Sequence, residues 1–213
     1  MRPIGVFGGM FDPIHYGHLR TAHELFELLD LEAIAFVPAG DPPHRPRPLA
    51  DGATRRAMVH AAIRSDRRFL VDDRELRRAG LSYTVLTLEE IRAERGRQPI
   101  ALIMGMDAFA GLGGWHRAAE LIGLAHIIVA VRPGAEPPRD GLAAELLRDR
   151  ACDDARRLSG VRAGLVYVNI GTQLDVSSSA VRDVVAAGRD PRYLMPEAVR
   201  RIIIARGSYA PAR

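Results

Sequence analysis

The chain has 213 residues, 47% hydrophobic and 26% charged, the balance of an ordinary globular protein of one domain. Its net charge of +4 comes from 30 arginines and no lysine, which excludes a Walker A loop, a Schiff base and a lysine nucleophile. The apolar runs are too short to span a membrane, Cys152 is the single cysteine, and the charge is spread along a chain with 6% aromatic residues, so we expect a cytoplasmic protein that binds neither membrane nor nucleic acid.

Short apolar runs, most of them rich in β-branched residues, predict the buried strands of a parallel sheet at Ile4–Phe7, Ala33–Val37, Phe69–Val71, Ile100–Met104, His126–Val131 and Leu165–Val168. Helical patterns fall between and after them, at Tyr16–Leu29, Thr54–Arg64, Val85–Glu94, Ala118–Leu124, Leu142–Arg156, Ser178–Ala187 and Pro196–Ala205. We place Pro196 in a first helical turn and interpret Pro38–Pro48 and Pro133–Asp140 as loops. The alternation predicts an α/β, Rossmann-like, doubly wound parallel sheet in a single domain, 1–213, with a C-terminal helical part from about residue 178.

The strongest motif is G-G-M-F-D-P-I-H-Y-G-H-L, residues 8–19. Two glycines end the first strand, and a helix begins near Tyr16, which places His15 and His18 at its start and on one side. Free N–H groups and the helix dipole favour an anion there, and two imidazoles can donate to phosphate oxygens as charge develops. Two alternatives are weaker: an incidental turn with surface histidines, and a metal site, for which no third ligand is evident.

This string resembles the H-x-G-H signature of the nucleotidyltransferase superfamily, and that of nicotinate-nucleotide adenylyltransferases in particular. Members make the deamido precursor of NAD from ATP and nicotinate mononucleotide, and the resemblance runs from Gly5 to about Ile204. It implies that His15 and His18 are catalytic and that they share the ATP site with Gly8, Gly9, Met10 and Phe11. Met10 stands where the family usually has threonine, so a hydroxyl contact to the nucleotide is missing.

A second motif, D-V-S-S-S-A-V-R at residues 175–182, resembles the I-S-S-T-x-I-R signature of the same family. Ser177 is a natural N-cap, which places Ser178 and Ser179 beside the free N–H groups of a first helical turn. Arg182 follows on the same face and can hold phosphate oxygens with its planar fork. Alone, such a sequence is more often a capped helix with a solvated arginine. Together with the first motif it predicts two helix N-termini around one triphosphate.

Four shorter elements extend the resemblance. P-A-G-D-P-P-H-R implies that His44 and Arg45 meet the phosphate of the second substrate, although such a loop is usually only a stiff connection. In S-Y-T the resemblance gives Thr84 to the pyridine carboxylate, and in W-H-R it stacks Trp115, in a loop that predicts exposure, on the ring.

G-M-D gives Gly105 and Asp107 to the adenosine, and Arg132 in V-R-P-G is a further anion contact. A helix cap by Ser82, Thr84 or Asp107 and a strand-end arginine at 132 are the structural alternatives. His23, His60 and His126 are interpreted as structural.

The reaction implied is direct displacement at the α-phosphorus of ATP by the phosphate of nicotinate mononucleotide, with Mg²⁺ held by the ATP phosphates and not by protein ligands. Pantetheine-phosphate adenylyltransferase is the nearest rival, but those chains are shorter and usually carry T-x-G-H. A nucleotide sensor without turnover is disfavoured because both histidines are present, and a dinucleotide-dependent oxidoreductase because no G-x-G-x-x-G occurs. The sequence leaves a homo-oligomer open.

Overall fold

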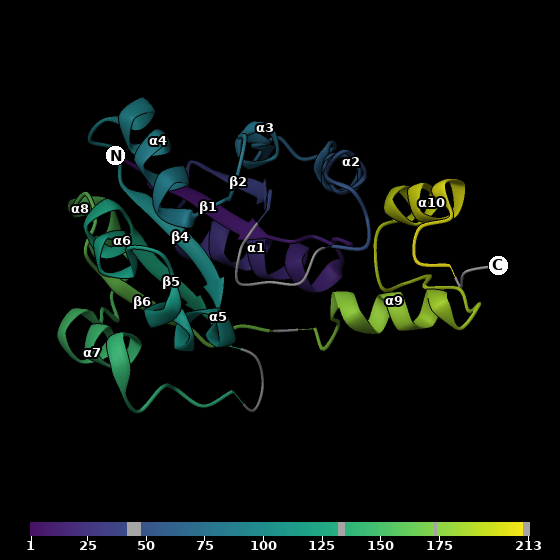
Figure 1. Cartoon of the computed structure of the whole chain (residues 1–213). Coiled ribbons are helices and arrows are strands. Elements are labelled where there is room, and N and C mark those ends of the chain that lie inside the picture. Colours follow the sequence, from purple (N-terminus) through teal and green to yellow (C-terminus); the bar gives the residue numbers. More distant parts are fainter. Residues whose placement is uncertain (42–47, 132–134, 173, 211–213) are drawn as a thin grey trace.

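The computed structural model describes residues 1–41, 48–131, 135–172 and 174–210 (Figure 1). Over these residues the chain forms a six-stranded, all-parallel sheet in the order β3-β2-β1-β4-β5-β6. The strands are β1 (Ile4–Gly9), β2 (Ala33–Pro38), β3 (Phe69–Val71), β4 (Ile100–Gly105), β5 (His126–Ala130) and β6 (Val166–Asn169). The predicted Rossmann-like α/β fold is confirmed.

The order of the strands reverses at the centre of the sheet, where β1 lies between β2 and β4. A crevice forms at such a switch point, outside the carboxyl ends of the two central strands, because their connections leave toward opposite faces. The ends in question are Gly8 and Gly9 of β1 and Gly105 of β4. The loops that follow these two strand ends are the ones predicted to bind ATP.

Helices cover both faces of the sheet (Figure 1). Successive side chains of a strand point to opposite faces, so Ile4 and Val6 pack into one core cluster and Phe7 into the other. The helices are α1 (Tyr16–Leu28), α2 (Gly52–Ile63), α3 (Arg74–Arg77), α4 (Thr84–Arg95), α5 (Met106–Ala110), α6 (Ala118–Leu124), α7 (Gly141–Arg150), α8 (Arg157–Gly160), α9 (Ser178–Ala186) and α10 (Glu197–Arg206), with a 3₁₀ turn, η1, at Leu112–Gly114.

The last two helices share the core of the face that α1 covers. Val181 of α9 and Val199 and Ile203 of α10 are buried in the same cluster as Phe7. Figure 1 shows α10 beside α2, and Arg206 at the end of α10 donates to Thr54 Oγ1 of α2 at 2.6 Å. The C-terminal helices are thus packed against the sheet domain within one continuous core.

One predicted helix, Leu142–Arg156, is wrong in its second half. α7 ends at Arg150, and Ala151 forms a parallel bridge with Val166 of β6. Cys152 is buried there, and its N–H donates to Val166 O at 2.8 Å. Ala151 and Cys152, which continue the apolar pattern of the predicted helix, therefore form a short extension of the sheet beside β6. Pro196 is the N-cap of α10 and not a first-turn residue.

Four short elements have no expectation in the sequence: α3, α5, α8 and η1. None exceeds five residues, which is too short for a helical period to be visible. Among the described helices, none is long and apolar enough to cross a membrane.

Candidate active site

The histidine pair lies at the N-terminus of α1, directly after the central strand β1. His15 is the N-cap, and its Nδ1 accepts the N–H of Gly17 at 3.1 Å. His18 Nδ1 in turn accepts the N–H of His15 at 3.3 Å. A ring nitrogen that accepts a backbone N–H carries no proton, so both rings hold their proton on Nε2. The backbone thereby fixes two imidazoles as Nε2–H donors.

The two rings are packed against each other, with centroids 3.8 Å apart and planes inclined by 32°. His15 is 1% exposed and His18 is half-buried, with the Phe11 ring 5.1 Å from its centroid. Gly17 explains the spacing of the motif, because a Cβ there would lie 2.9 Å from Cε1 of His15. A side chain at that position would displace the ring from its capping bond.

The carboxyl ends of β1 and β4 have open space beside the backbone. Among the described residues, a Cβ added at Gly8 or at Gly105 would meet no atom within 4 Å. Asp107, in the first turn of α5, is exposed close to Gly105, and the N-cap of that helix is Gly105. Asp107 is therefore not a helix cap, contrary to the structural alternative, and its carboxylate faces solvent near the switch point.

The C-terminal motif meets the first motif directly. Ser177 caps α9, as predicted, by accepting the N–H of Ala180. Ser178 Oγ donates to Pro13 O at 2.9 Å, and Arg182 Nη1 donates to Asp12 O at 2.8 Å. The structure thus brings the N-termini of α1 and α9 together, although the two motifs lie more than 150 residues apart.

Arg182 and the serines take positions that the sequence alone does not define. The second terminal nitrogen of Arg182, Nη2, donates to Ser179 Oγ at 3.1 Å, and Ser179 is exposed. The hydroxyl of Ser178 donates its hydrogen bond to the loop after β1, so it holds the two motifs together. Arg182 and Ser179 are therefore better placed than Ser178 to meet an incoming anion.

Asp12 holds the loop after β1 in place, a role that sequence reasoning missed. Its carboxylate, 4% exposed, accepts the N–H of Leu49 at 2.8 Å, the N–H of Ala50 at 3.1 Å and the hydroxyl of Tyr209 at 2.6 Å. Bonds to a buried carboxylate are the strong kind of hydrogen bond. Asp12 was visible in the motif only as half of an Asp-Pro turn.

Arg55 of α2 is a second missed residue. It is 2% exposed, and its guanidinium donates to Met10 O at 2.9 Å and to Ala50 O at 3.3 Å. Burial lowers the pKa of Arg55 below its usual value, while Asp12 acts in the opposite direction. A helical arginine gives no sequence signal that it is buried, so this support for Met10 could not be predicted.

The two elements predicted to hold the pyridine ring, S-Y-T and W-H-R, meet on the face of the sheet that α4 covers. Thr84 is the first residue of α4, and Tyr83 before it stacks on His116 with ring centroids 4.3 Å apart. His116 follows Trp115, so this contact joins the S-Y-T and W-H-R elements. Trp115 is half-buried against the core cluster of that face, more covered than its Gly-Gly neighbours predict.

No side chain caps α4, so the capping alternative for Ser82 and Thr84 is wrong. Among the described residues, Ser82 Oγ is buried without a hydrogen-bond partner. His44, Arg45 and Arg132 lie outside the described residues. Within the described part of the chain, no three His, Cys, Asp or Glu side chains converge as a metal site requires.

Known proteins match this chain along most of its length. Residues 6–184 match the cytidylyltransferase-like family. A protein of Methylococcus capsulatus named "Probable nicotinate-nucleotide adenylyltransferase" is 42% identical over 208 residues, 97% of this chain and 99% of the relative. A protein of Halorhodospira halophila with the same name is 43% identical over 210 residues, 98% and 96% of the two chains.

A solved structure, the nicotinic acid mononucleotide adenylyltransferase of Plasmodium falciparum complexed with NaAD, superposes with a TM-score of 0.76 and covers 98% of both chains. At 16% identity this likeness establishes the fold. The relatives at above 40% identity, aligned over nearly the full length of both chains, establish the family as well. The paired histidines at the switch point thus stand in a chain that belongs to the nicotinate-nucleotide adenylyltransferases of the cytidylyltransferase-like family.

Proposed function

We propose that the protein transfers AMP from ATP to nicotinate mononucleotide and releases deamido-NAD and pyrophosphate, a step of NAD biosynthesis. The observation that carries this proposal is the meeting of two helix N-termini, α1 with its histidine pair and α9 with Arg182, beside the crevice of the sheet. Each N-terminus favours anions, and a triphosphate supplies several of them. Relatives above 40% identity that carry the name of this activity support it.

In this reaction an oxygen of the mononucleotide phosphate attacks the α-phosphorus of ATP. The new P–O bond forms as the bond from the α-phosphorus to the bridging oxygen breaks, and the electron pair leaves with pyrophosphate. The attacking phosphate is already ionised, so the protein supplies position and charge stabilisation. No covalent intermediate on the protein is needed.

The histidine pair meets the charge that develops on the α-phosphate. Because the Nδ1 atoms of His15 and His18 accept backbone N–H groups, both rings present an N–H donor at Nε2. A donor fixed in advance stabilises a transition state without reorganising as the charge builds. Backbone groups of Gly9 and Met10 line the same loop, while Arg182 and Ser179 take the β- and γ-phosphates.

Mg²⁺ enters with ATP, whose phosphate oxygens are the hard ligands it prefers. When bound, it neutralises charge on the phosphates and on the departing pyrophosphate. Asp107 lies near Gly105 at the end of β4, and we assign it to the ribose of the adenosine. Thr84 and Trp115 hold the pyridine ring, and His44, Arg45 and Arg132 meet the mononucleotide phosphate.

The test is release of pyrophosphate from ATP and Mg²⁺ with three acceptors: nicotinate mononucleotide, nicotinamide mononucleotide and phosphopantetheine. We expect kcat/KM for the acid to exceed that for the amide by roughly ten- to a hundredfold, the cost of one misplaced buried donor. Equal kcat/KM values for the acid and the amide contradict the proposal that the protein recognises the ring carboxylate, but they do not contradict adenylyl transfer. A preference for phosphopantetheine contradicts the proposed substrate.

A further inference from the structure

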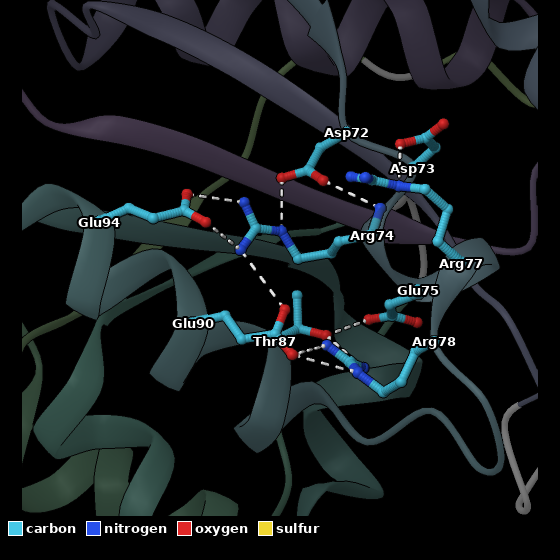
Figure 2. Close-up of polar contacts among 9 residues, drawn as sticks. All are labelled: Asp72, Asp73, Arg74, Glu75, Arg77, Arg78, Thr87, Glu90 and Glu94. Atoms are coloured by element: carbon cyan, nitrogen blue, oxygen red, sulfur yellow. Dashed lines mark hydrogen bonds and ion pairs between the residues drawn. The ribbon is translucent and has the colours of Figure 1, made fainter.

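A half-buried carboxylate, that of Glu75, lies between two segments that the proposed function assigns to the second substrate. Glu75 belongs to α3, the short helix after β3, and Figure 2 shows it pointing toward Thr87 of α4. Its Oε1 accepts the hydroxyl of Thr87 at 2.7 Å. Thr87 is 2% exposed and lies one turn after Thr84, so the bond fixes the first turns of α4 to α3.

The other oxygen of Glu75 reaches the loop after β2. Its Oε2 accepts the N–H of Gly40 at 3.4 Å. A Cβ at Gly40 would collide with the carbonyl oxygen of Glu75 and with Ser82 Oγ, so a glycine is what permits the contact. Gly40 and Asp41 are followed in the sequence by the segment that carries His44 and Arg45.

The contacts around Glu75 continue to W-H-R, the remaining element that the proposed function assigns to the pyridine ring. The N–H of Ser82 donates to Asp41 O at 3.0 Å, so the loop after β2 is also tied to the start of S-Y-T. Tyr83 then stacks on His116, beside Trp115. Glu75 therefore contacts the loop after β2 and α4 with one carboxylate, and Tyr83 at the start of α4 stacks on His116, the sequence neighbour of Trp115.

We infer that Glu75 is a positioning residue for the pyridine nucleotide, which sets the loop after β2 and the N-terminus of α4 at one fixed separation. This inference rests on the proposed function. It follows from the contacts because Gly40 lies in the loop that leads to His44 and Arg45, whereas Thr87 lies one turn after Thr84. Within the described part of the chain, the side chain of Glu75 accepts hydrogen bonds from Gly40 and Thr87, neither of which is assigned to the phosphates of ATP.

The neighbouring ion pairs provide a matched control. Arg74 pairs with Glu94 at 2.9 Å on the same surface of α3 and α4, and Figure 2 shows both in the same network. Glu94 joins the two helices as Glu75 does, yet its pair does not include the loop after β2. A role that only holds α3 to α4 would therefore be shared by Glu94.

The experiment compares Glu75→Ala, Glu75→Gln and the matched control Glu94→Ala by steady-state kinetics, and it measures by calorimetry the Kd of each variant for each substrate alone. We expect Glu75→Ala to raise KM and Kd for nicotinate mononucleotide by roughly tenfold, the scale on which a misplaced positioning group acts, and to leave the KM of ATP within about twofold. Both oxygens of Glu75 accept hydrogen bonds, whereas a glutamine offers one acceptor oxygen and one NH₂ donor, so Glu75→Gln can keep the bond from Thr87 or the bond from Gly40 but not both. Its KM for nicotinate mononucleotide should therefore lie between those of the wild type and Glu75→Ala.

Thr87→Val removes the partner hydroxyl at nearly constant shape. If Glu75→Ala does not fold, Thr87→Val takes its place, and we expect it to raise the KM for nicotinate mononucleotide in the same way. The inference is overturned if a folded Glu75→Ala keeps the wild-type KM for the mononucleotide. It is also overturned if the KM of ATP rises equally, or if Glu94→Ala has the same effect as Glu75→Ala. A wild-type protein that does not use nicotinate mononucleotide overturns the proposed function itself, whereas wild-type turnover with an unaffected Glu75→Ala overturns only the inference.

Discussion

The hydroxyl of Tyr209 donates to Oδ1 of Asp12 across 2.6 Å, and this bond ties the chain that follows α10 to the loop that follows β1. Both side chains are buried, at 9% and 4% exposure. Burial and the bond to Asp12 raise the pKa of the Tyr209 phenol, so it remains a donor throughout the physiological range. The residues around the histidine pair therefore depend on a contact from the far end of the sequence.

Tyr209→Phe should lower the free energy of unfolding by about 1.5–3 kcal/mol, because it removes one of the three bonds that described residues make to the buried carboxylate of Asp12 and keeps the ring. Urea unfolding followed by circular dichroism measures the change. Tyr193→Phe is the control: Tyr193 is 84% exposed, and its replacement should change stability by less than about 0.5 kcal/mol. Equal stabilities for both variants and the wild type would show that the bond contributes nothing.

The sequence predicts the sheet well because strands and long helices are recorded in local patterns. Gly8, His15 and His18 could be placed from the sequence because each lies at a strand end or a helix start, which short-range residue order defines. Asp12, Arg55 and Tyr209 could not, because their partners lie 37 to 197 residues away. A buried polar residue is recognised only when its partner is known, and that requires the fold.

His18→Ala should leave the fold intact and lower kcat by roughly 10²–10³, the usual loss for one fixed transition-state donor. The reason is that the N–H of His15 fixes the His18 ring with its proton on Nε2. Pyrophosphate release at saturating substrates gives kcat, and circular dichroism checks the fold. His60→Ala is the control, because His60 is exposed on α2. A folded His18→Ala with turnover close to that of His60→Ala would remove His18 from catalysis.

Arg182→Ala should weaken binding of ATP by about 1.5–3 kcal/mol, the range for hydrogen bonds to charged groups. Arg182 is held by Asp12 O and Ser179 Oγ at the start of α9, so it is already oriented beside the histidine loop. Calorimetry gives the Kd of ATP with Mg²⁺ present. Arg189→Ala, an exposed position after α9, serves as the control. An unchanged Kd for Arg182→Ala would leave Arg182 with the single role of joining α9 to the loop.

His126 is the first residue of β5 and is fully buried, between the W-H-R and V-R-P-G elements of the sequence. Its Nδ1 accepts the N–H of Leu165 at 3.2 Å, so Nε2 carries the proton and donates to Val161 O at 3.0 Å. Burial lowers the pKa of His126 below 6.5, and the charge of Arg92 acts in the same direction. The folded protein therefore holds this ring neutral.

Because the pKa of His126 is lower in the folded state, the unfolded chain takes up the proton first as the pH falls. The stability that the neutral ring contributes is complete above the unfolded pKa of about 6.5 and is lost progressively below it, by at most about 1.4 kcal/mol per pH unit. Urea unfolding at pH 7.5, 6.5 and 5.5 should show this decline in the wild type. His126→Gln should start less stable at pH 7.5 and decline less steeply, whereas His60→Gln, at an exposed position, should follow the wild type. Equal slopes for the wild type and His126→Gln would mean that another group governs the acid-side loss.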